Sequence, residues 1–152
     1  MDELDFSLCC KQQLASIVDG QRYRPRQPLI LAVDDDEDNL LLLAYILEPF
    51  GCTLITAVDG IGALSLARTY LPDLILLDIL MPQMDGIEVI SELRKDSKTQ
   101  TLPAIAVTAL AIPQQRERLL LAGFNDYVSK PYMLEDIEAT VQRHLRVKAT
   151  IS

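Results

Sequence analysis

Short apolar runs alternate with longer segments of helical spacing from residue 29 onward. Such runs are typical of strands buried in a parallel sheet, and apolar residues every three or four positions indicate helices with one buried face. Pro113 begins one such segment and Gly123 follows it, as expected at helix ends. The pattern predicts strands at 29–33, 53–57, 74–77, 104–107 and 126–128, and helices at 37–50, 60–70, 86–95, 113–122 and 133–147.

Strict alternation of strands and helices predicts an α/β fold with a parallel sheet. Right-handed crossovers leave few topologies open, and the flavodoxin-like, doubly wound order 2-1-3-4-5 fits five strands with five helices. In that order the switch point lies between strands 1 and 3. Ligands of open α/β sheets bind outside the carboxyl ends of such strands.

The chain divides into three parts. Residues 1–28 form a short N-terminal extension, with a possible helix carrying Cys10, Leu14 and Ile17 on one stripe, followed by a basic linker that contains prolines. Residues 29–147 form the domain, and 148–152 form a C-terminal tail.

Composition and charge limit the number of domains, the kinds of partner and the cellular compartment that we expect for the chain. The 152 residues suit one domain, and the net charge of −8 argues against a nucleic-acid surface. The cysteines Cys9, Cys10 and Cys52 lack the spacing of a disulfide framework or a zinc site, which indicates a reducing, cytoplasmic setting. The acidic N-terminus is no signal peptide, and no apolar stretch predicts a membrane span.

Carboxylates stand at two strand ends that the predicted topology makes neighbours. Asp78 directly follows the apolar run 74–77, and Asp34 and Asp35 follow the first strand. Crowded carboxylates repel one another, so one pKa rises unless a cation intervenes. An open site with oxygen ligands alone suits Mg²⁺.

The run of acidic residues at 34–38 has other interpretations. Capping of the following helix explains residues 36–38, although it does not explain Asp78. The spacing of Asp34 and Asp36 also resembles that of haloacid-dehalogenase-type phosphatases, in which Asp34 would be the nucleophile. Asp38 departs from the pattern of that family, which weakens this interpretation. A phosphohydrolase is therefore kept only as an alternative function.

Two further strand ends carry polar groups. Thr108 ends the fourth strand, where its hydroxyl can donate to an anion or bond its own backbone. Lys130 follows the fifth strand, where it can enter the same crevice or lie in a surface turn. A carboxylate nucleophile, acidic metal ligands, a hydroxyl and an ammonium together are what phosphoryl transfer to a carboxylate requires.

Four motifs in order carry a family resemblance. Residues 29–145 resemble the receiver domain of response regulators in two-component signalling. The motifs are Val33-Asp34-Asp35, Leu77-Asp78 with the following Met81-Pro82 and Asp85-Gly86, Val107-Thr108-Ala109, and Ser129-Lys130-Pro131. Each is weak alone, and their occurrence at successive strand ends makes the combination specific.

The resemblance implies a role for each matching residue. Asp78 corresponds to the phosphoacceptor. Asp34 and Asp35 correspond to the acidic pair that holds Mg²⁺ with Asp78, Asp35 being the more direct ligand, and the backbone carbonyl of Leu80 completes the metal shell. Thr108 and Lys130 would bind the phosphoryl oxygens.

The resemblance also implies switching and docking positions. Thr108 and Tyr127 correspond to the pair that moves on phosphorylation, and the Lys130–Pro131 bond is expected to be cis. Asn39 and Leu42 match positions where receivers dock a phosphodonor. The implied function is that of a single-domain regulator rather than an enzyme with turnover.

The implied partners are proteins. The donor would be a phosphohistidine on a sensor kinase or a histidine phosphotransfer protein, and the phosphorylated regulator would signal to a downstream protein as a monomer or weak homodimer. No membrane or nucleic-acid partner is expected. A receiver-like binding module without phosphotransfer remains an alternative.

Some residues depart from the common pattern. Leu80 and Leu110 stand where polar residues help to position the hydrolytic water in the family, which predicts slow autodephosphorylation; simple packing is the competing interpretation. The helix segment 40–47 is apolar almost all round, which predicts either a partner surface or a cover by the N-terminal extension. His144 is expected to contact the dipole at the end of the last helix.

Overall fold

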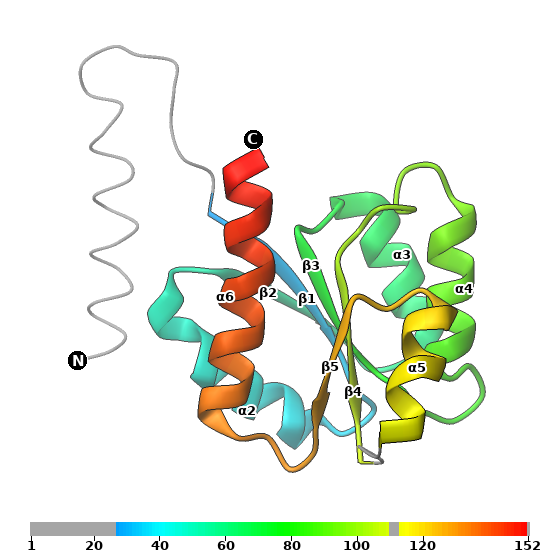
Figure 1. Cartoon of the computed structure of the whole chain (residues 1–152), viewed down its shortest axis with the longest axis horizontal. Helices are drawn as coiled ribbons and strands as arrows, with labels where there is room; N and C mark the ends of the chain where they lie inside the picture. Colours follow the sequence, from blue (N-terminus) through cyan, green and yellow to red (C-terminus); the bar gives the residue numbers. More distant parts are fainter. Residues whose placement is uncertain (1–26, 110–112, 152) are drawn as a thin grey trace.

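Five parallel strands form the centre of the molecule (Figure 1). The computed structural model describes residues 27–109 and 113–151. The strand order is β2-β1-β3-β4-β5, which confirms the predicted topology. The strands are β1 Leu29–Val33, β2 Thr53–Ala57, β3 Leu74–Asp78, β4 Ala104–Thr108 and β5 Asp126–Ser129.

Helices cover both faces of the sheet, so the molecule has three layers (Figure 1). One face carries α2 and α6, and the other carries α3, α4 and α5. The helical segments are α2 Glu37–Leu47, the short 3₁₀ helix η1 Glu48–Phe50, α3 Gly60–Tyr70, α4 Gly86–Lys95, α5 Pro113–Ala122 and α6 Leu134–Ile151.

The apolar runs of the sequence fill two cores, one on each side of the sheet. All residues of β3 and β4 are buried, because helices cover both of their faces. In β2, at the sheet edge, only Ala57 is buried. Aliphatic side chains therefore hold the central strands rigidly, and the carboxyl ends of these strands are fixed relative to one another.

The predicted boundaries needed a few corrections. The helix expected over 37–50 changes to 3₁₀ geometry after Leu47, because Pro49 has no N–H to continue the α-helical bonding. The last helix continues to Ile151, so most of the predicted tail is helical. His144 consequently lies within the helix, and its ring nitrogen contacts Asp126 at 3.1 Å instead of a helix end.

Several predictions lie outside the described residues. They are the predicted helix of the N-terminal extension with Cys9 and Cys10, most of the linker, and Leu110. Within the described part of the chain, no helix has the length and apolar character needed to cross a bilayer.

Gly86 brings the start of α4 against the end of β3. Its N–H donates to the carbonyl of Ile79 at 2.9 Å, and a Cβ at this position would lie only 2.5 Å from the carbonyl oxygen of Asp78. A side chain here would therefore displace backbone beside Asp78. The helix itself begins with a capping box between Asp85 and Glu88.

Arg94, near the C-terminal end of α4, connects several segments of the domain through hydrogen bonds. Its guanidinium donates twice to the carbonyl of Gly123, at 2.7 and 3.0 Å, and also to the carbonyls of Thr99 and Gln100. A further bond reaches the side-chain oxygen of Asn125, which in turn accepts from the backbone of β4. One side chain thus ties α4 to the connection between α5 and β5.

Candidate functional site

Three carboxylates meet at the carboxyl ends of β1 and β3. Val33 pairs with Leu77 in the sheet, so the residues that follow, Asp34 and Asp78, lie side by side. One oxygen from each of these residues and from Asp35 lies within 4.8 Å of the others. Asp34 and Asp78 are buried, whereas Asp35 is exposed. The cluster therefore faces solvent on the side of Asp35.

A single ammonium group bridges the two buried carboxylates. Nζ of Lys130 lies 3.1 Å from Oδ2 of Asp34 and 3.1 Å from Oδ2 of Asp78. The lysine follows β5, and its backbone N–H donates to the carbonyl of Thr108 at 2.8 Å. The bond from Lys130 to Pro131 is cis, which confirms the expectation. Strands β1, β3 and β5 are thereby linked through one side chain.

Asp34 accepts more bonds than the strand-end pattern indicates. Its Oδ1 atom accepts from the backbone of Asp36 at 2.9 Å. Besides the ammonium of Lys130, its Oδ2 atom accepts from the Asn39 amide at 3.1 Å and from the Tyr132 hydroxyl at 3.2 Å. Sequence reasoning did not single out Tyr132; its place two residues after Lys130, at the same edge of the sheet, was the available signal.

Charge and burial shift several pKa values. Burial, together with the nearby charge of Asp34, raises the pKa of Asp78 to about 6, although Lys130 and the Leu80 N–H act in the opposite direction. Burial acts to lower the pKa of Lys130, but its bonds to both carboxylates outweigh this and leave the value raised. Burial and the charge of Asp34 raise the pKa of Tyr132, so its hydroxyl keeps its proton and donates.

The remaining predicted residues surround this cluster at different depths. Thr108 is buried at the end of β4, where its neighbour Val107 pairs with Asp78. Tyr127 is partly buried against the core beneath α3, α4 and α5. Leu80 is 58% exposed, and its backbone N–H donates to Oδ1 of Asp78 at 3.3 Å.

Comparison with known proteins identifies the family. A model of the response regulator receiver domain matches residues 30–142. The chain belongs to this family.

Its relatives include a small response regulator. The chain is 37% identical over 116 residues to the polar-differentiation response regulator DivK of Brucella anthropi, covering 76% of the chain and 94% of DivK. A 14.6 kDa protein of Leptolyngbya boryana is 44% identical over 115 residues, covering 76% of the chain and 88% of that protein. The receiver domain therefore acts in phosphoacceptor signalling.

A solved structure extends the similarity to a metal-bound site. The receiver domain of a sensor histidine kinase from Pseudomonas aeruginosa, with magnesium coordinated in its active-site cleft, superposes with a TM-score of 0.71 and 33% identity. The match covers 78% of the chain and 97% of that structure.

The donor set of this receiver domain fits such a cation. Asp34, Asp35 and Asp78 offer oxygen atoms only, as Mg²⁺ prefers. Three carboxylates and the ammonium of Lys130 leave two formal negative charges, which a divalent cation would balance. Because Asp35 is exposed, the cluster is open to solvent on this side.

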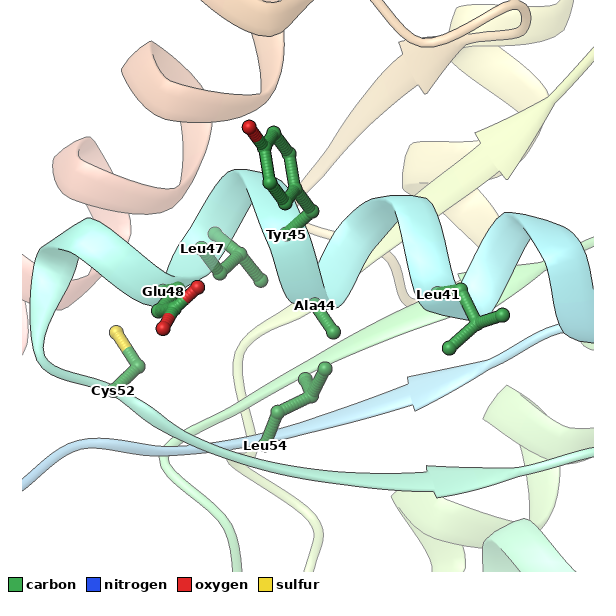
Figure 2. Close-up of a pocket in the computed structure, with 7 residues that line it drawn as sticks. All are labelled: Leu41, Ala44, Tyr45, Leu47, Glu48, Cys52 and Leu54. Atoms are coloured by element: carbon green, nitrogen blue, oxygen red, sulfur yellow. The ribbon is translucent and has the colours of Figure 1, made fainter. Parts of the chain in front are cut away.

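An apolar surface on α2 lies apart from the carboxylates. Leu41 and Tyr45 are 70% and 69% exposed, and Leu42 is 43% exposed. A groove of about 350 Å³ lies between α2 and β2 at the sheet edge, and Ala44 of α2 points toward Leu54 of β2 (Figure 2). The expected docking residues are placed differently: Leu42 is on this surface, whereas the amide of Asn39 is bonded to Asp34.

Proposed function

We propose that Asp78 is the phosphoacceptor of this receiver domain. The observation that carries the proposal is the ammonium of Lys130, held between Asp34 and Asp78 at 3.1 Å from each, beside an exposed third carboxylate. This arrangement supplies a nucleophilic oxygen and fixed positive charge at one point.

The reaction follows from these groups. An oxygen of Asp78 attacks the phosphorus atom of a phosphohistidine, the P–N bond breaks, and the electron pair stays on the histidine nitrogen of the donor. The product is an acyl phosphate, which water hydrolyses to restore the carboxylate. Lys130 and the hydroxyl of Thr108 bind the phosphoryl oxygens. The domain thus modifies itself and does not turn over an external substrate.

Asp34, Asp35 and Asp78 would hold Mg²⁺, together with the backbone carbonyl of Leu80. When bound, the ion would balance negative charge on the phosphoryl oxygens. The buried position of two of the three carboxylates supports this assignment. Asp35, as the exposed member, meets solvent and would be a more direct ligand than Asp34.

Asp34 is less suited to be the nucleophile that a haloacid-dehalogenase-type phosphatase would need. Its side chain has no exposed surface, and its two oxygens accept from Asp36, Asn39, Lys130 and Tyr132. Among the described residues, Asp78 accepts from Lys130 and from the backbone of Leu80, and it lies beside the exposed Asp35. These contacts favour transfer to Asp78.

Signalling would then use surfaces beside the site. Thr108 and Tyr127 would form the switch that reports phosphorylation. Thr108 ends β4, and Tyr127 lies in the neighbouring strand β5, just before Lys130. The phosphodonor, a histidine kinase or histidine phosphotransfer protein, would dock over Asn39 and over the exposed α2 surface that includes Leu42. A downstream protein would bind the switched form, which acts as a monomer or weak homodimer.

The buried free thiol of Cys52 supports a reducing compartment, the cytoplasm.

The decisive experiment is incubation with acetyl phosphate and Mg²⁺ followed by intact mass measurement. The wild type and Asp136→Asn, a control at an exposed carboxylate of α6, should each gain one phosphoryl group. Asp78→Asn should gain none, and a chelator should abolish the adduct. An adduct on Asp78→Asn, or turnover of a chromogenic phosphate ester that depends on Asp34, would contradict the assignment.

A further inference from the structure

Tyr132 links the last part of the domain to the first strand. Its hydroxyl donates to Oδ2 of Asp34 at 3.2 Å across 98 positions of sequence. Its ring is partly buried against the core between the sheet and the helices α2 and α6. Packing therefore fixes the ring, and the fixed ring aims the hydroxyl at one carboxylate oxygen.

The donors around Asp34 hold its carboxylate in one orientation. Oδ1 is taken by the backbone of Asp36, and Oδ2 is shared by Asn39, Lys130 and Tyr132. The side chain is fully buried, so water does not replace a missing donor without rearrangement. Each of the three Oδ2 donors therefore contributes to where the carboxylate points.

The ammonium of Lys130 is shared between Asp34 and Asp78, because it also lies 3.1 Å from Asp78. This inference rests on the proposed function, in which Lys130 turns to the phosphoryl oxygens on Asp78. When it does so, the hydroxyl of Tyr132 and the amide of Asn39 are the side-chain donors that stay on Oδ2.

We propose that Tyr132 is a positioning residue, whose hydroxyl holds the Asp34 carboxylate in the orientation that Mg²⁺ requires. Hydrogen bonds from outside the metal shell orient the ligands, and their loss typically weakens metal binding by about 10–100-fold. Tyr132 shares its task with Asn39 and Lys130. We therefore expect its removal to act near the lower end, roughly tenfold.

The test compares Tyr132→Phe with Tyr70→Phe in the full chain. The first keeps the packed ring and removes only the hydroxyl, and the second removes a hydroxyl from a tyrosine on α3 that is 54% exposed. Calorimetric titration with Mg²⁺ is suitable, because the chain has no tryptophan to report binding by fluorescence. The Kd should rise roughly tenfold in Tyr132→Phe and stay unchanged in Tyr70→Phe.

A second readout separates positioning from general stability. The rate of phosphorylation by acetyl phosphate should fall in Tyr132→Phe at low Mg²⁺ and return to the wild-type rate at saturating Mg²⁺. A merely structural role would lower the unfolding temperature and leave the Kd for Mg²⁺ unchanged, and that result would overturn the proposal. An unchanged or tighter Kd with normal phosphorylation would do the same while leaving the role of Asp78 intact. A wild type that neither binds Mg²⁺ nor accepts phosphate would overturn the proposed function and this inference with it.

Discussion

Ionisation of Asp78 is less favourable in the folded protein than in the unfolded chain. Burial and the charge of Asp34 raise its pKa to about 6, whereas an exposed aspartate in the unfolded chain titrates near its ordinary value of 3.8. The folded state therefore takes up a proton at a higher pH than the unfolded state. For this group, stability is greatest at low pH and is lost as the pH rises through about 6.

The prediction concerns Asp78→Asn without metal. A neutral amide removes the cost of burying the charge and the repulsion from Asp34, so the free energy of unfolding near neutral pH should rise by up to about 3 kcal/mol, following the shift in pKa. The gain should shrink as the pH falls from about 6 toward 4, because the wild-type carboxyl becomes neutral as well. Urea unfolding in chelator at several pH values measures both.

Two comparisons sharpen this measurement. Added Mg²⁺ should stabilise the wild type and reduce the difference from Asp78→Asn. Asp136→Asn, at an exposed position, should follow the wild type throughout. Equal unfolding curves for the wild type and Asp78→Asn in chelator would show that the carboxylates do not repel.

Leu80 is an exposed residue beside Asp78, the proposed phosphoacceptor. It is 58% exposed, its backbone bonds to Asp78, and its side chain has no group to orient water. We expect the phosphorylated protein to outlast a timescale of seconds and Leu80→Asn to shorten its lifetime. Leu121→Asn, at a leucine of α5 that is 84% exposed, is the control. The loss of the adduct with time, followed by intact mass, is the measurement; rapid loss from the wild type would refute the expectation.

Among the elements, α4 is fixed to neighbouring segments by Arg94, and its helical pattern in the sequence does not indicate these contacts. Five hydrogen bonds run from this guanidinium to the segment before β4 and to the connection between α5 and β5. Arg94 is partly buried, and this burial lowers the pKa of its guanidinium. The neighbouring Lys95, by contrast, is exposed and makes one contact of 3.4 Å with Glu92.

We predict that Arg94→Ala lowers the free energy of unfolding by about 2–3 kcal/mol, because several backbone carbonyls lose their donor. Lys95→Ala on the same helix should change it by less than about 0.5 kcal/mol. Urea unfolding of both variants tests the difference, and a similar loss in the two would contradict the role given to Arg94.

The elements also show what the sequence could and could not predict. Buried strands and amphipathic helices leave clear periodic patterns, and polar residues at strand ends stand out against them, so the topology and the cluster around Asp78 were predictable. The contacts of Tyr132 and Arg94 were not, because they depend on how distant segments pack. His144 was misplaced for a related reason, since the helix continues to Ile151 through residues whose pattern was too weak to predict it.

The molecule as a whole carries its carboxylate cluster and its exposed apolar surface on different residues. The carboxylates lie at the ends of β1 and β3, whereas Leu41, Leu42 and Tyr45 are exposed on α2. Exposed apolar patches commonly mark sites of protein interaction. On the proposed function, we therefore expect a small donor to need only the carboxylates and a protein donor to need both regions.

Leu41→Ser therefore should slow transfer from a histidine phosphotransfer protein by roughly tenfold, the effect of losing a moderate interface contact. Phosphorylation by acetyl phosphate should remain at the wild-type rate. Leu121→Ser should affect neither reaction. Rates of transfer from a radiolabelled donor protein test this, and equal rates for Leu41→Ser and the wild type would exclude the surface from docking.

The contact between Tyr132 and Asp34 joins residues 98 positions apart, and that between Lys130 and Asp78 joins residues 52 apart. A chain still emerging from the ribosome, or one cut before β5, has the acidic strand ends without the ammonium and the hydroxyl that hold them. On the proposed function, we expect such fragments not to accept a phosphoryl group, so that competence for phosphorylation begins only when β5 and the residues after it have folded onto the sheet.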